Sequence, residues 1–351
     1  MKVCYFGIYD PNYPRNEIII SGLRENGVEV IECNIRSKGI KKYFDLYFKH
    51  RRIKRDYDFM VVGFLGQGIM FWAKLLSRKK IIFDAFLSLY NTNVFDRKRY
   101  SPKSLRGRYD FFLDQFSCRL ANLVLLDTNA HIDYFVETFK LPRRKFKRIF
   151  VGANNRLFYP LTPQEKKNSF VVHFHGYLVP FHGIEYVIEA AKILKDEDIE
   201  GQIVTRFDLN YRKVKDSVDR LGLTNINFFE VVPFAELKNY INRADVCLGV
   251  FGDSKKRDLV IPNKIYEALA CQKPVITAES KACQETLTDG VNCFYVRPAD
   301  AKDLASKILE LKNNPGLLKP VALNGYKLYQ KNLTPKILIQ RLLTDLKNEH
   351  F

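Results

Sequence analysis

The chain has 351 residues, 46% hydrophobic and 27% charged, which is long enough for two domains and too apolar for a disordered protein. Its net charge of +18 predicts anionic partners: nucleic acid, an anionic membrane surface or phosphorylated small molecules. The seven cysteines are scattered and include no C-x-x-C pair, which argues against a disulfide framework. The sequence has no long apolar stretch, which argues against a secretory signal and a membrane span. We therefore expect a cytoplasmic protein with buried thiols.

The first half alternates short apolar runs with helical patterns. Residues 3–8 read as a strand, the next helical stretch ends at Asn26 and Gly27, and strand character resumes at residues 28–31. Further β-rich runs are residues 57–64, 80–83 and 122–126. This alternation predicts a parallel sheet with helices on both faces.

The pattern restarts at residues 169–174, after a polar segment with two prolines that predicts a domain boundary between residues 163 and 164. An amphipathic helix over residues 183–194 follows. Further predicted strands are residues 202–205, 226–229, 246–250, 274–277 and 293–296. The chain therefore predicts two doubly wound domains, with ligands at the carboxyl ends of their strands in a shared cleft. The last helix, residues 334–347, has an apolar face that we expect to pack back on the first domain.

Residues 257–270 carry the clearest signal for a ligand. Pro262 is suited to a helix start, and strong helix formers follow it, so we expect a helix to begin near Pro262 or Asn263. The free N–H groups at that end attract phosphate, and Lys264 and Arg257 add positive charge. The segment predicts a site for a diphosphate.

Glu267 lies one turn into this helix. Its carboxylate could accept two hydrogen bonds from the vicinal hydroxyls of a ribose. An exposed glutamate is also favoured near a helix N-terminus for electrostatic reasons alone. Spacing leaves these two interpretations equally open.

Residues 260–285 resemble the donor-binding region of retaining GT-B glycosyltransferases, the glycosyl transferases group 1 family (glycosyltransferase family 4-like). The similar motifs are KIYEALA at 264–270, KPVIT at 273–277, and Glu285 followed by Asp289-Gly290. The resemblance implies a GT-B fold of two Rossmann-like domains facing across a cleft: residues 1–163 bind the acceptor and residues 164–351 the nucleotide sugar. It also implies a hexosyl- or related glycosyltransferase that moves the sugar to an acceptor hydroxyl with retention, in glycolipid, polysaccharide or other glycoconjugate synthesis.

Two further segments are similar to that family. Residues 174–184, with His175-Gly176, resemble the first strand, loop and helix of its second domain, where the loop approaches the donor diphosphate. Residues 80–90, with Asp84, resemble the segment that carries acceptor-side polar groups. Residues 127–131 resemble the end of the first domain's sheet.

The chain departs from the family pattern where charged residues are common. Leu259 stands where many members have a second glutamate, eight positions before Glu267, so one donor-sugar contact is missing or made by a neighbour. Tyr177 and His182 stand where arginine and lysine commonly grip the diphosphate. We infer that Lys264, together with Arg206 or Arg257, supplies the cation.

These arguments define a candidate site. We predict catalytic roles for Asp84, His175 and Lys264. We predict donor binding by Gly176, Tyr177, His182, Arg206, Arg257, Ile261, Asn263, Lys264, Glu267 and Glu285. Asp84 could instead be a helix cap or turn residue. Of His173 and His175 we expect only one to face the ligand, and Gly176 favours His175. No spacing of carboxylates and histidines suggests a metal, and no cofactor is expected beyond the nucleotide sugar.

Residues 36–55, from Arg36 to Arg55, interleave basic and aromatic side chains. Such a run is either a solvated helix face or a surface that docks on anionic lipid; we favour lipid, and with it a lipid-linked acceptor and a peripheral location on the inner face of the cell membrane.

Two other classes compete with the transferase. A nicotinamide oxidoreductase should show G-x-G-x-x-G after the first strand, which Gly7 and its successors lack, and a nucleic-acid-binding protein would explain the charge but shows no known motif, so we expect no nucleic acid partner.

Overall fold

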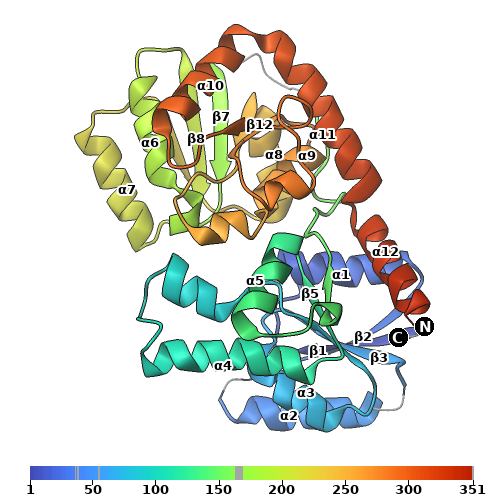
Figure 1. The fold of residues 1–351 in the computed structure, drawn as a ribbon. Coiled ribbons are helices and arrows are strands. Elements are labelled where there is room, and N and C mark those ends of the chain that lie inside the picture. The colour runs from blue at the N-terminus through green and yellow to red at the C-terminus, as the bar shows by residue number, and fades with distance from the viewer. Residues whose placement is uncertain (36, 38, 54–55, 163–168, 350–351) are drawn as a thin grey trace. The chain divides into compact units, whose positions relative to one another are not determined.

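The computed structural model describes residues 1–35, 37, 39–53, 56–162 and 169–349. The chain divides into two compact units. Unit 1 consists of Met1–Gly152 and Thr334–Phe351, and unit 2 consists of Ala153–Leu333 (Figure 1). Each unit has its own sheet and its own hydrophobic core.

The sheet of unit 1 contains six parallel strands among the described residues, in the order β2-β1-β3-β4-β5-β6. The strands are β1 (Lys2–Gly7), β2 (Glu29–Asn34), β3 (Phe59–Val62), β4 (Ile81–Asp84), β5 (Leu123–Leu126) and β6 (Phe146–Arg148). Strands β3, β4 and β5 are buried at every position, as a parallel sheet covered on both faces requires.

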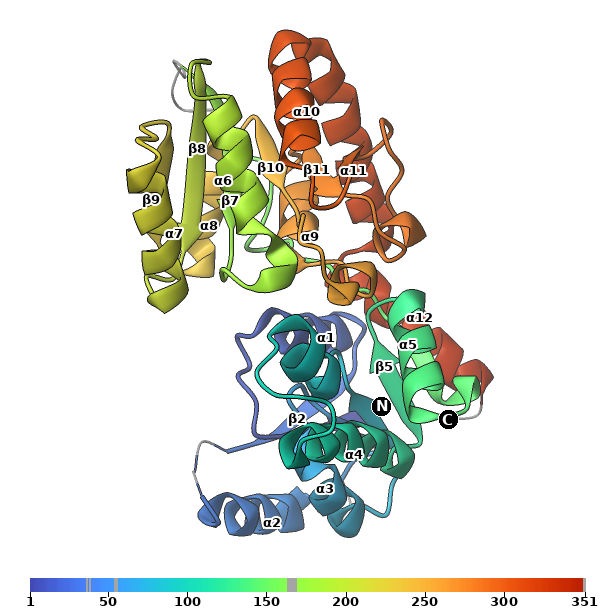
Figure 2. The ribbon, with the colours of Figure 1, turned by 60° about the vertical axis from the view of Figure 1, so that its left-hand side comes forward.

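Helices cover both faces of this sheet. They are α1 (Pro14–Glu25), α2 (Lys41–Ile53), α3 (Met70–Leu76), α4 (Leu105–Leu120), α5 (Asn129–Phe139) and α12 (Pro335–Asn348). Short helical turns are η1 (Gln67–Ile69), η2 (Asn91–Asp96) and η3 (Arg143–Lys145). Helices α2 and α3 lie on one face, and α1 and α12 on the other (Figures 1 and 2). Ser104 and Thr128 cap α4 and α5 by accepting backbone hydrogen bonds.

The last helix, α12, packs on α1. A side chain at Gly22 would meet Ile339 Cγ1 and the carbonyl of Pro335 at 2.4 Å, so only glycine allows this approach. Asn26 Nδ2 donates a hydrogen bond to the carbonyl oxygen of Lys336 at 2.9 Å. The apolar face of α12, with Leu338 and Leu346, is thereby buried within unit 1.

The sheet of unit 2 also contains six parallel strands in the described part of the chain, in the order β12-β11-β10-β7-β8-β9. The strands are β7 (Phe170–His175), β8 (Ile199–Thr205), β9 (Ile226–Glu230), β10 (Val246–Leu248), β11 (Val275–Ala278) and β12 (Phe294–Val296). The predicted alternation of strands and helices is therefore confirmed in both halves.

The helices of unit 2 are α6 (Ile184–Ile193), α7 (Leu209–Arg220), α8 (Phe234–Arg243), α9 (Asn263–Ala270), α10 (Ala301–Asn313) and α11 (Leu318–Asn332). Short turns are η4 (Pro180–His182), η5 (Lys255–Asp258), η6 (Cys283–Glu285) and η7 (Pro315–Leu317). Helix α6 contributes Ile184 and Ile188, and α10 contributes Leu304 and Ile308, to a core over one face of the sheet.

The segment before residue 163 is tied to unit 2. Leu161 N donates to Asn242 Oδ1 at 2.9 Å, and Asn242 Nδ2 donates to the carbonyl of Tyr159 at 3.1 Å. Tyr329 OH donates to the carbonyl of Ala153 at 3.0 Å. The units therefore divide at residue 152, ahead of the predicted 163/164 boundary, because long-range hydrogen bonds invisible to composition hold this segment. Residues 163–168 lie outside the described residues.

Two expectations from composition concern cysteines and membrane spans. All seven cysteines are buried and unbridged, as small apolar side chains are in a core. Within the described ranges, no helix combines the length and the hydropathy that a membrane crossing would require.

Candidate functional site

The site is built where β7 of unit 2 ends. His173 and His175 lie on β7, and both are buried. Residues two apart on a strand point to the same face, so the two rings lie side by side, and of the two only His175 contacts Glu267 among the described residues. Their rings contact each other, with His173 Nε2 2.9 Å from His175 Nδ1.

Helix α9 supplies the second wall. It begins at Asn263 after Pro262, as the sequence predicts. Lys264 and Glu267 lie three positions apart on it, hence on one helix face, and both are buried, with 5% and 3% of their surface exposed. A buried lysine and a buried glutamate side by side are unusual in a protein interior.

Lys264 has an incomplete environment. Its Nζ lies 3.6 Å from the centre of the Phe174 ring and has no hydrogen-bond partner among the described residues. Burial lowers the pKa of this amine well below its ordinary value, and the neighbouring Glu267 opposes that shift. A buried ammonium whose three donors are unused is costly, so the group is a candidate for binding an anion.

The loop after β7 leaves space beside this amine. Gly176 has φ +123°, a conformation that side chains rarely adopt, and a Cβ there would lie 3.5 Å from both Lys264 Nζ and His182 Cε1. Gly176, His182 and Lys264 therefore converge on one small volume. Of the donor-binding residues predicted from sequence, the structure brings these three together with His175 and Glu267.

His182 is fixed by its own loop. Its Nδ1 lies 2.5 Å from the carbonyl oxygen of Tyr177 and donates to it. Gly183 follows with φ +66°, and a side chain there would meet the backbone nitrogen of Gly252 at 2.4 Å. Burial, and next the charge of Lys264, hold the pKa of His182 well below its ordinary value, so the ring is neutral.

His175 links the strand to the helix. Its Nε2 lies 2.6 Å from Glu267 Oε2. Burial and the charge of Lys264 lower the pKa of His175 to about 3, and burial raises the pKa of Glu267 to about 8 while Lys264 opposes that rise. Both residues thus have pKa values displaced by burial, as is frequent at functional sites.

The other predicted donor residues lie in the same unit. Tyr177 is 53% exposed, and the guanidinium of exposed Arg206 lies 5.4 Å from the centre of its ring. Asn263 is half-buried at the first position of α9, and Ile261 is buried just before it. Glu285, on η6, is half-buried. The structure tests none of these roles, which stay predictions.

Arg257 and Leu259 have local partners. Arg257 Nη1 donates to the carbonyl of Gly252 at 3.1 Å, and its Nη2 pairs with Asp258 Oδ1 at 3.0 Å. Leu259 is partly buried and packs on a small apolar cluster that includes Phe181 and Val260. The glutamate that the family pattern would place here is therefore replaced by a packing residue.

Asp84 belongs to unit 1 and has no exposed surface. Arg15 Nε and Nη2 donate to its carboxylate at 2.8 to 3.1 Å, and Arg15 Nη1 donates to the carbonyl of Ile149 at 2.7 Å. The ion pair joins α1, the end of β4 and the segment after β6. This geometry gives Asp84 a structural function, whereas its predicted catalytic role stays untested.

Asp127 and His131 of unit 1 form a buried pair that we did not predict from the sequence. Asp127 directly follows β5, and its Oδ1 lies 2.8 Å from His131 Nδ1 on α5. Both side chains are buried, and Asp127 Oδ2 has no hydrogen-bond partner within the described ranges. The signal available in the sequence was the spacing of four residues, which brings the two together once α5 begins at Asn129.

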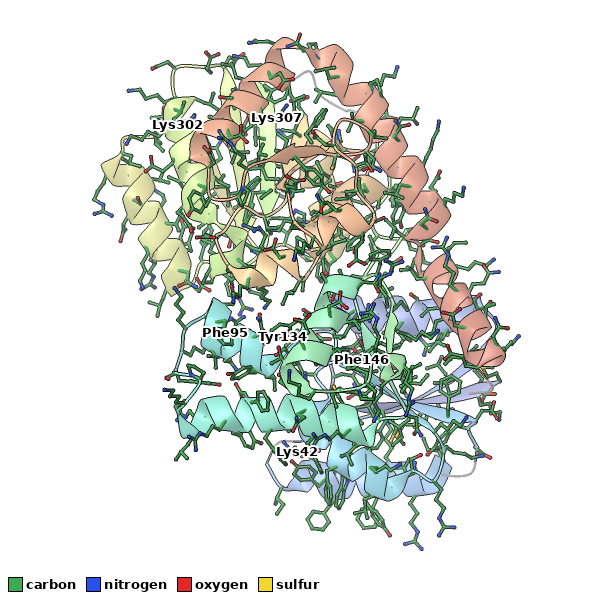
Figure 3. All side chains as sticks on the ribbon, in the orientation of Figure 1. Lys42, Phe95, Tyr134, Phe146, Lys302 and Lys307 are labelled. Carbon is green, nitrogen blue, oxygen red and sulfur yellow. The ribbon has the colours of Figure 1, made fainter. Side chains whose placement is uncertain are left out.

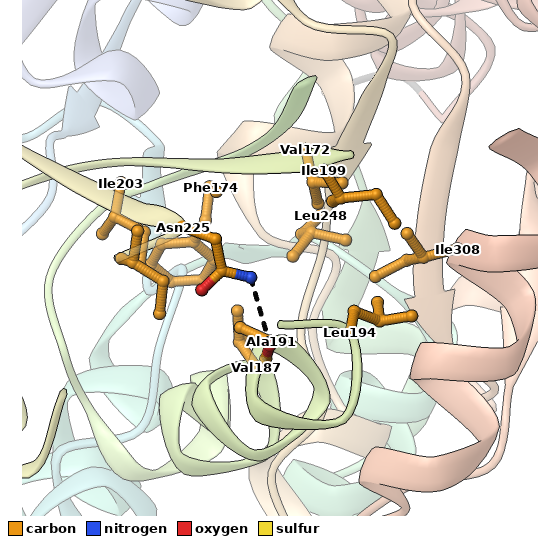
Figure 4. A pocket seen from close by; sticks show the side chains of 12 residues that line it. Val172, Phe174, Val187, Ala191, Leu194, Ile199, Ile203, Asn225, Leu248 and Ile308 are labelled. Carbon is orange, nitrogen blue, oxygen red and sulfur yellow. Dashed lines mark hydrogen bonds between the residues drawn. The ribbon is translucent and has the colours of Figure 1, made fainter. Parts of the chain in front are cut away.

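A small cavity of about 30 Å³ lies inside unit 2, and none of these polar groups is among its lining residues. Its walls are apolar side chains of the sheet and α6, including Val172, Val187 and Ile203, together with Asn225, which donates to the carbonyl of Ala191 at 3.2 Å (Figure 4). A volume of this size holds about one water molecule, so it is a packing space in the core. Among the described residues, no group of three or more His, Cys, Asp or Glu side chains is arranged to hold a metal ion.

The two sheets and their order have counterparts in solved structures. The structure of HepE from Anabaena in complex with UDP-glucose matches this chain with a TM-score of 0.77 and 17% identity, over 99% of this chain and 100% of that one. At this identity the likeness establishes the fold. Two parallel six-stranded sheets flanked by helices place the chain in the GT-B class, which confirms the predicted fold class.

Sequence comparisons give the family. Residues 169–314, which lie in unit 2, match the family model described as "Glycosyl transferases group 1", and this match confirms the predicted resemblance. An uncharacterized glycosyltransferase of Methanocaldococcus jannaschii is 27% identical over 263 residues, 73% of this chain and 66% of the relative. The capsular polysaccharide biosynthesis glycosyltransferase CapM of Staphylococcus aureus is 26% identical over 176 residues, 50% of this chain and 45% of CapM. The chain thus spans less than two thirds of either relative's length in these alignments.

Proposed function

We propose that this protein is a retaining glycosyltransferase that moves a sugar from a nucleoside diphosphate sugar to an acceptor hydroxyl. The observation that carries the proposal is Lys264, a buried amine without a hydrogen-bond partner in the described part of the chain, beside Gly176 and at the start of α9. The family of unit 2 and the UDP-glucose named in the HepE complex support the same class of donor.

The diphosphate would bind at the start of α9. Ile265 N already donates to the carbonyl of Pro262 at 3.1 Å, and no side chain caps the helix, so the amides of Asn263 and Lys264 are the ones that would meet the phosphates. Lys264 would add a full positive charge in a site from which protein atoms exclude water. As the glycosidic bond lengthens, the leaving diphosphate gains negative charge, and preorganised donors stabilise it. We propose that Lys264 and these amides carry this charge without a metal ion.

The ribose would bind at Glu267. Its Oε2 is held by His175, while Oε1 forms no hydrogen bond with any described residue and is available to the vicinal hydroxyls. The earlier alternative, an exposed glutamate with an electrostatic role, is less favoured because Glu267 is 3% exposed. We propose that Asp84 acts by holding Arg15 and the backbone of the acceptor domain, and that retention follows from the family.

A thermal-shift panel of UDP, GDP, ADP and dTDP tests the donor class. We expect a rise in the melting temperature with at least one of them, since ligands that bind the folded state stabilise it by mass action. The same nucleotide should give little shift with Lys264→Ala. Absence of a shift with all four nucleotides, well above millimolar concentrations, would overturn the proposal.

We further propose that the acceptor is lipid-linked and that α2 docks on an anionic membrane surface. Phe44, Tyr47 and Phe48 follow the i, i+3, i+4 spacing of one helix face, and they are 57%, 37% and 57% exposed. Side chains extend outward from α2, where Lys42 is labelled (Figure 3). Arg36, Lys38, Lys54 and Arg55 of the same predicted segment lie outside the described residues.

Charge and aromatic rings complement each other on this face. Lys41, Arg51 and Arg52 are exposed at the two ends of the aromatic stripe. Aromatic rings favour the interface between lipid headgroups and acyl chains, and each basic residue near an anionic surface contributes about 1 kcal/mol. An ordinary solvated helix face does not require three exposed aromatic residues in a row on one side.

A sedimentation assay tests the docking surface by comparing vesicles of neutral lipid alone with vesicles that also contain about 30% anionic lipid. We expect anionic vesicles to bind the protein, and Phe44→Ser with Phe48→Ser to weaken binding about tenfold or more. Leu209→Ser on α7, which removes a 72% exposed side chain from unit 2, is the matched control and should bind as well as wild type. Equal sedimentation with neutral and anionic vesicles would exclude docking by charge.

A further inference from the structure

Four buried polar side chains of unit 2 form one continuous chain that ends at the donor site. Gln202 on β8 contacts His173, with Nε2 2.8 Å from His173 Nδ1. His173 Nε2 lies 2.9 Å from His175 Nδ1, and His175 Nε2 lies 2.6 Å from Glu267 Oε2. Gln202 and His173 have no exposed surface.

The direction of the hydrogen bonds follows from one backbone carbonyl. Gln202 Nε2 donates to the carbonyl oxygen of Tyr240 at 3.0 Å, and a carbonyl oxygen can only accept. The amide nitrogen of Gln202 therefore faces both Tyr240 and His173, and it uses its second hydrogen to donate to His173 Nδ1. Arg243 Nη1, at 3.5 Å from Gln202 Oε1, is a donor on the other side of the amide.

This amide orientation fixes the tautomer of each ring. A neutral His173 that accepts at Nδ1 carries its proton on Nε2 and donates it to His175 Nδ1. His175 must then carry its proton on Nε2 and donate to Glu267 Oε2. Burial holds the pKa of both histidines well below the ordinary value, so both rings are neutral and the assignment is consistent.

We infer that Gln202 and His173 are positioning residues for the nucleotide: through His175 they hold Glu267 as an oriented hydrogen-bond acceptor for the ribose hydroxyls. The inference rests on the proposed function, because it assigns the ribose to Glu267. A hydrogen bond donated by His175 favours the carboxylate form of Glu267 against the effect of burial. It also leaves Oε1 as the oxygen that meets the ligand.

The opposite polarity would leave the contact between His173 and the Gln202 side chain without a hydrogen bond. If a protonated Glu267 donated to His175 Nε2, each ring would carry its proton on Nδ1, and His173 would need an acceptor. The group at that position is the Gln202 amide nitrogen, which has no lone pair to offer. The hydrogen bonds from Gln202 on β8 to Glu267 on α9 therefore fix which nitrogen of each histidine carries the proton, in addition to holding the two elements together.

The tautomers can be measured without any ligand. Nitrogen-15 NMR of the full-length protein with labelled histidine should show His173 and His175 in the Nε2–H form, assigned by comparison with His173→Asn. Gln202→Glu conserves the side-chain shape but offers only acceptor oxygens, so the His173 proton should move to Nδ1. A wild-type spectrum with Nδ1–H in either ring would overturn the inference.

The ribose role is measured by calorimetric titration with UDP, GDP or ADP, whichever binds, and with its 2′-deoxy counterpart. Measured above the pKa of about 8 of Glu267, where this group is a carboxylate, wild type should favour the ribonucleotide about tenfold, since a hydrogen bond to a charged group contributes this much or more. Gln202→Met, which keeps the length and removes the donor, should reduce the preference to about twofold or less. Affinity for the deoxynucleotide should change by less than about twofold, because Lys264 and the α9 amides are untouched.

Asn225→Leu is the matched control. It removes another side-chain amide that donates to a backbone carbonyl in unit 2, in the core behind the sheet (Figure 4). It should keep the wild-type ribose preference. An unchanged preference in both Gln202→Met and Gln202→Glu would reduce the chain to a structural contact and overturn the inference.

The two measurements separate the possible failures. If none of the nucleotides binds, the proposed function fails and the ribose assignment fails with it, whatever the tautomers are. If a nucleotide binds and wild type shows no preference for the ribonucleotide, the inference fails while the transferase proposal stands.

Discussion

Each unit contains a buried cluster of charged side chains, and the two clusters differ in how completely they are satisfied. In unit 1, Arg15 and Asp84 have no exposed surface and bind each other through two guanidinium nitrogens, while a third donates to the carbonyl of Ile149. In unit 2, Lys264 is also buried, with 5% of its surface exposed, but makes no hydrogen bond with the described residues.

The difference separates structure from function. A buried charge that the protein itself neutralises has no capacity left for a ligand, and removing its partner is costly. A buried charge with unused donors is tolerated in the folded protein at a cost in stability, which a bound anion would remove. The comparison therefore indicates a structural role for Arg15 and Asp84 and supports the proposed binding role of Lys264.

The largest expected effect is on the stability of unit 1. Arg15→Met leaves the carboxylate of Asp84 buried without a partner, and we expect the free energy of unfolding to fall by about 3–5 kcal/mol. Urea unfolding followed by the fluorescence of Trp72, the single tryptophan, reports on this unit. The double variant Arg15→Met with Asp84→Leu should recover part of the loss. A loss below about 1 kcal/mol in the single variant would contradict a structural pair.

Lys264→Met should have the opposite profile. We expect transfer, measured as kcat/KM with a nucleotide sugar, to fall at least about 100-fold, as when one electrostatic stabiliser of the leaving group is removed. The free energy of unfolding should stay the same or rise by about 1 kcal/mol, because an unpartnered charge has left the interior. Near-normal transfer, or a loss of stability like that of Arg15→Met, would assign Lys264 to structure.

Glu267→Ala should also reduce kcat/KM by about 100-fold, since it removes the oxygen that accepts hydrogen bonds from the ribose hydroxyls. Unlike Lys264→Met, it should abolish discrimination between a ribonucleotide and its 2′-deoxy form while the diphosphate still binds. Calorimetric titration measures both quantities, and Asn225→Leu is again the control. Retained discrimination would remove Glu267 from the ribose site.

The smallest effect is a pH dependence of unit 2. In the unfolded chain each histidine binds a proton near pH 6.5, whereas His175 in the folded protein stays neutral down to about pH 3. Between these two pH values the unfolded state therefore binds more protons than the folded state. The free energy of unfolding consequently falls as the pH falls. From pH 7 to pH 5, His175 alone accounts for about 2 kcal/mol. His173, His182 and Lys264, whose pKa values burial lowers, act in the same direction. Glu267, whose pKa burial raises to about 8, acts in the opposite direction and offsets part of this fall.

Unit 1 provides the contrast. Burial raises the pKa of Asp114 to about 7, so the folded state holds a proton that the unfolded chain has released, and this residue stabilises unit 1 as the pH falls from 7 toward 4. In urea unfolding, the change from pH 7 to pH 5 should therefore lower the midpoint of the far-UV circular dichroism signal, to which unit 2 contributes, more than the midpoint of the Trp72 fluorescence signal. Equal shifts in both signals would contradict the contrast between the units.

The sequence predicted the elements and part of the site. Apolar periodicity located the strands and helices, because each is decided by neighbours a few residues away. Pro262 and the residues after it located the start of α9, and the family resemblance placed Lys264, Glu267, His175 and Gly176 in one site. The structure brings the side chains of Lys264, Glu267 and His175 together beside the backbone of Gly176.

The tertiary structure alone decided which charges are neutralised. Asp84 and Arg15 are 69 positions apart, and Gln202 and His173 are 29 apart, so no local pattern could show that they meet. The same holds for Asn242, which ties the segment before residue 163 to unit 2, and for α12, which returns to α1. A sequence determines which residues can carry charge into a core, because residue type and periodicity are local. Whether a buried charge is satisfied depends on atoms brought within about 3 Å by folding, and only the three-dimensional arrangement contains that information.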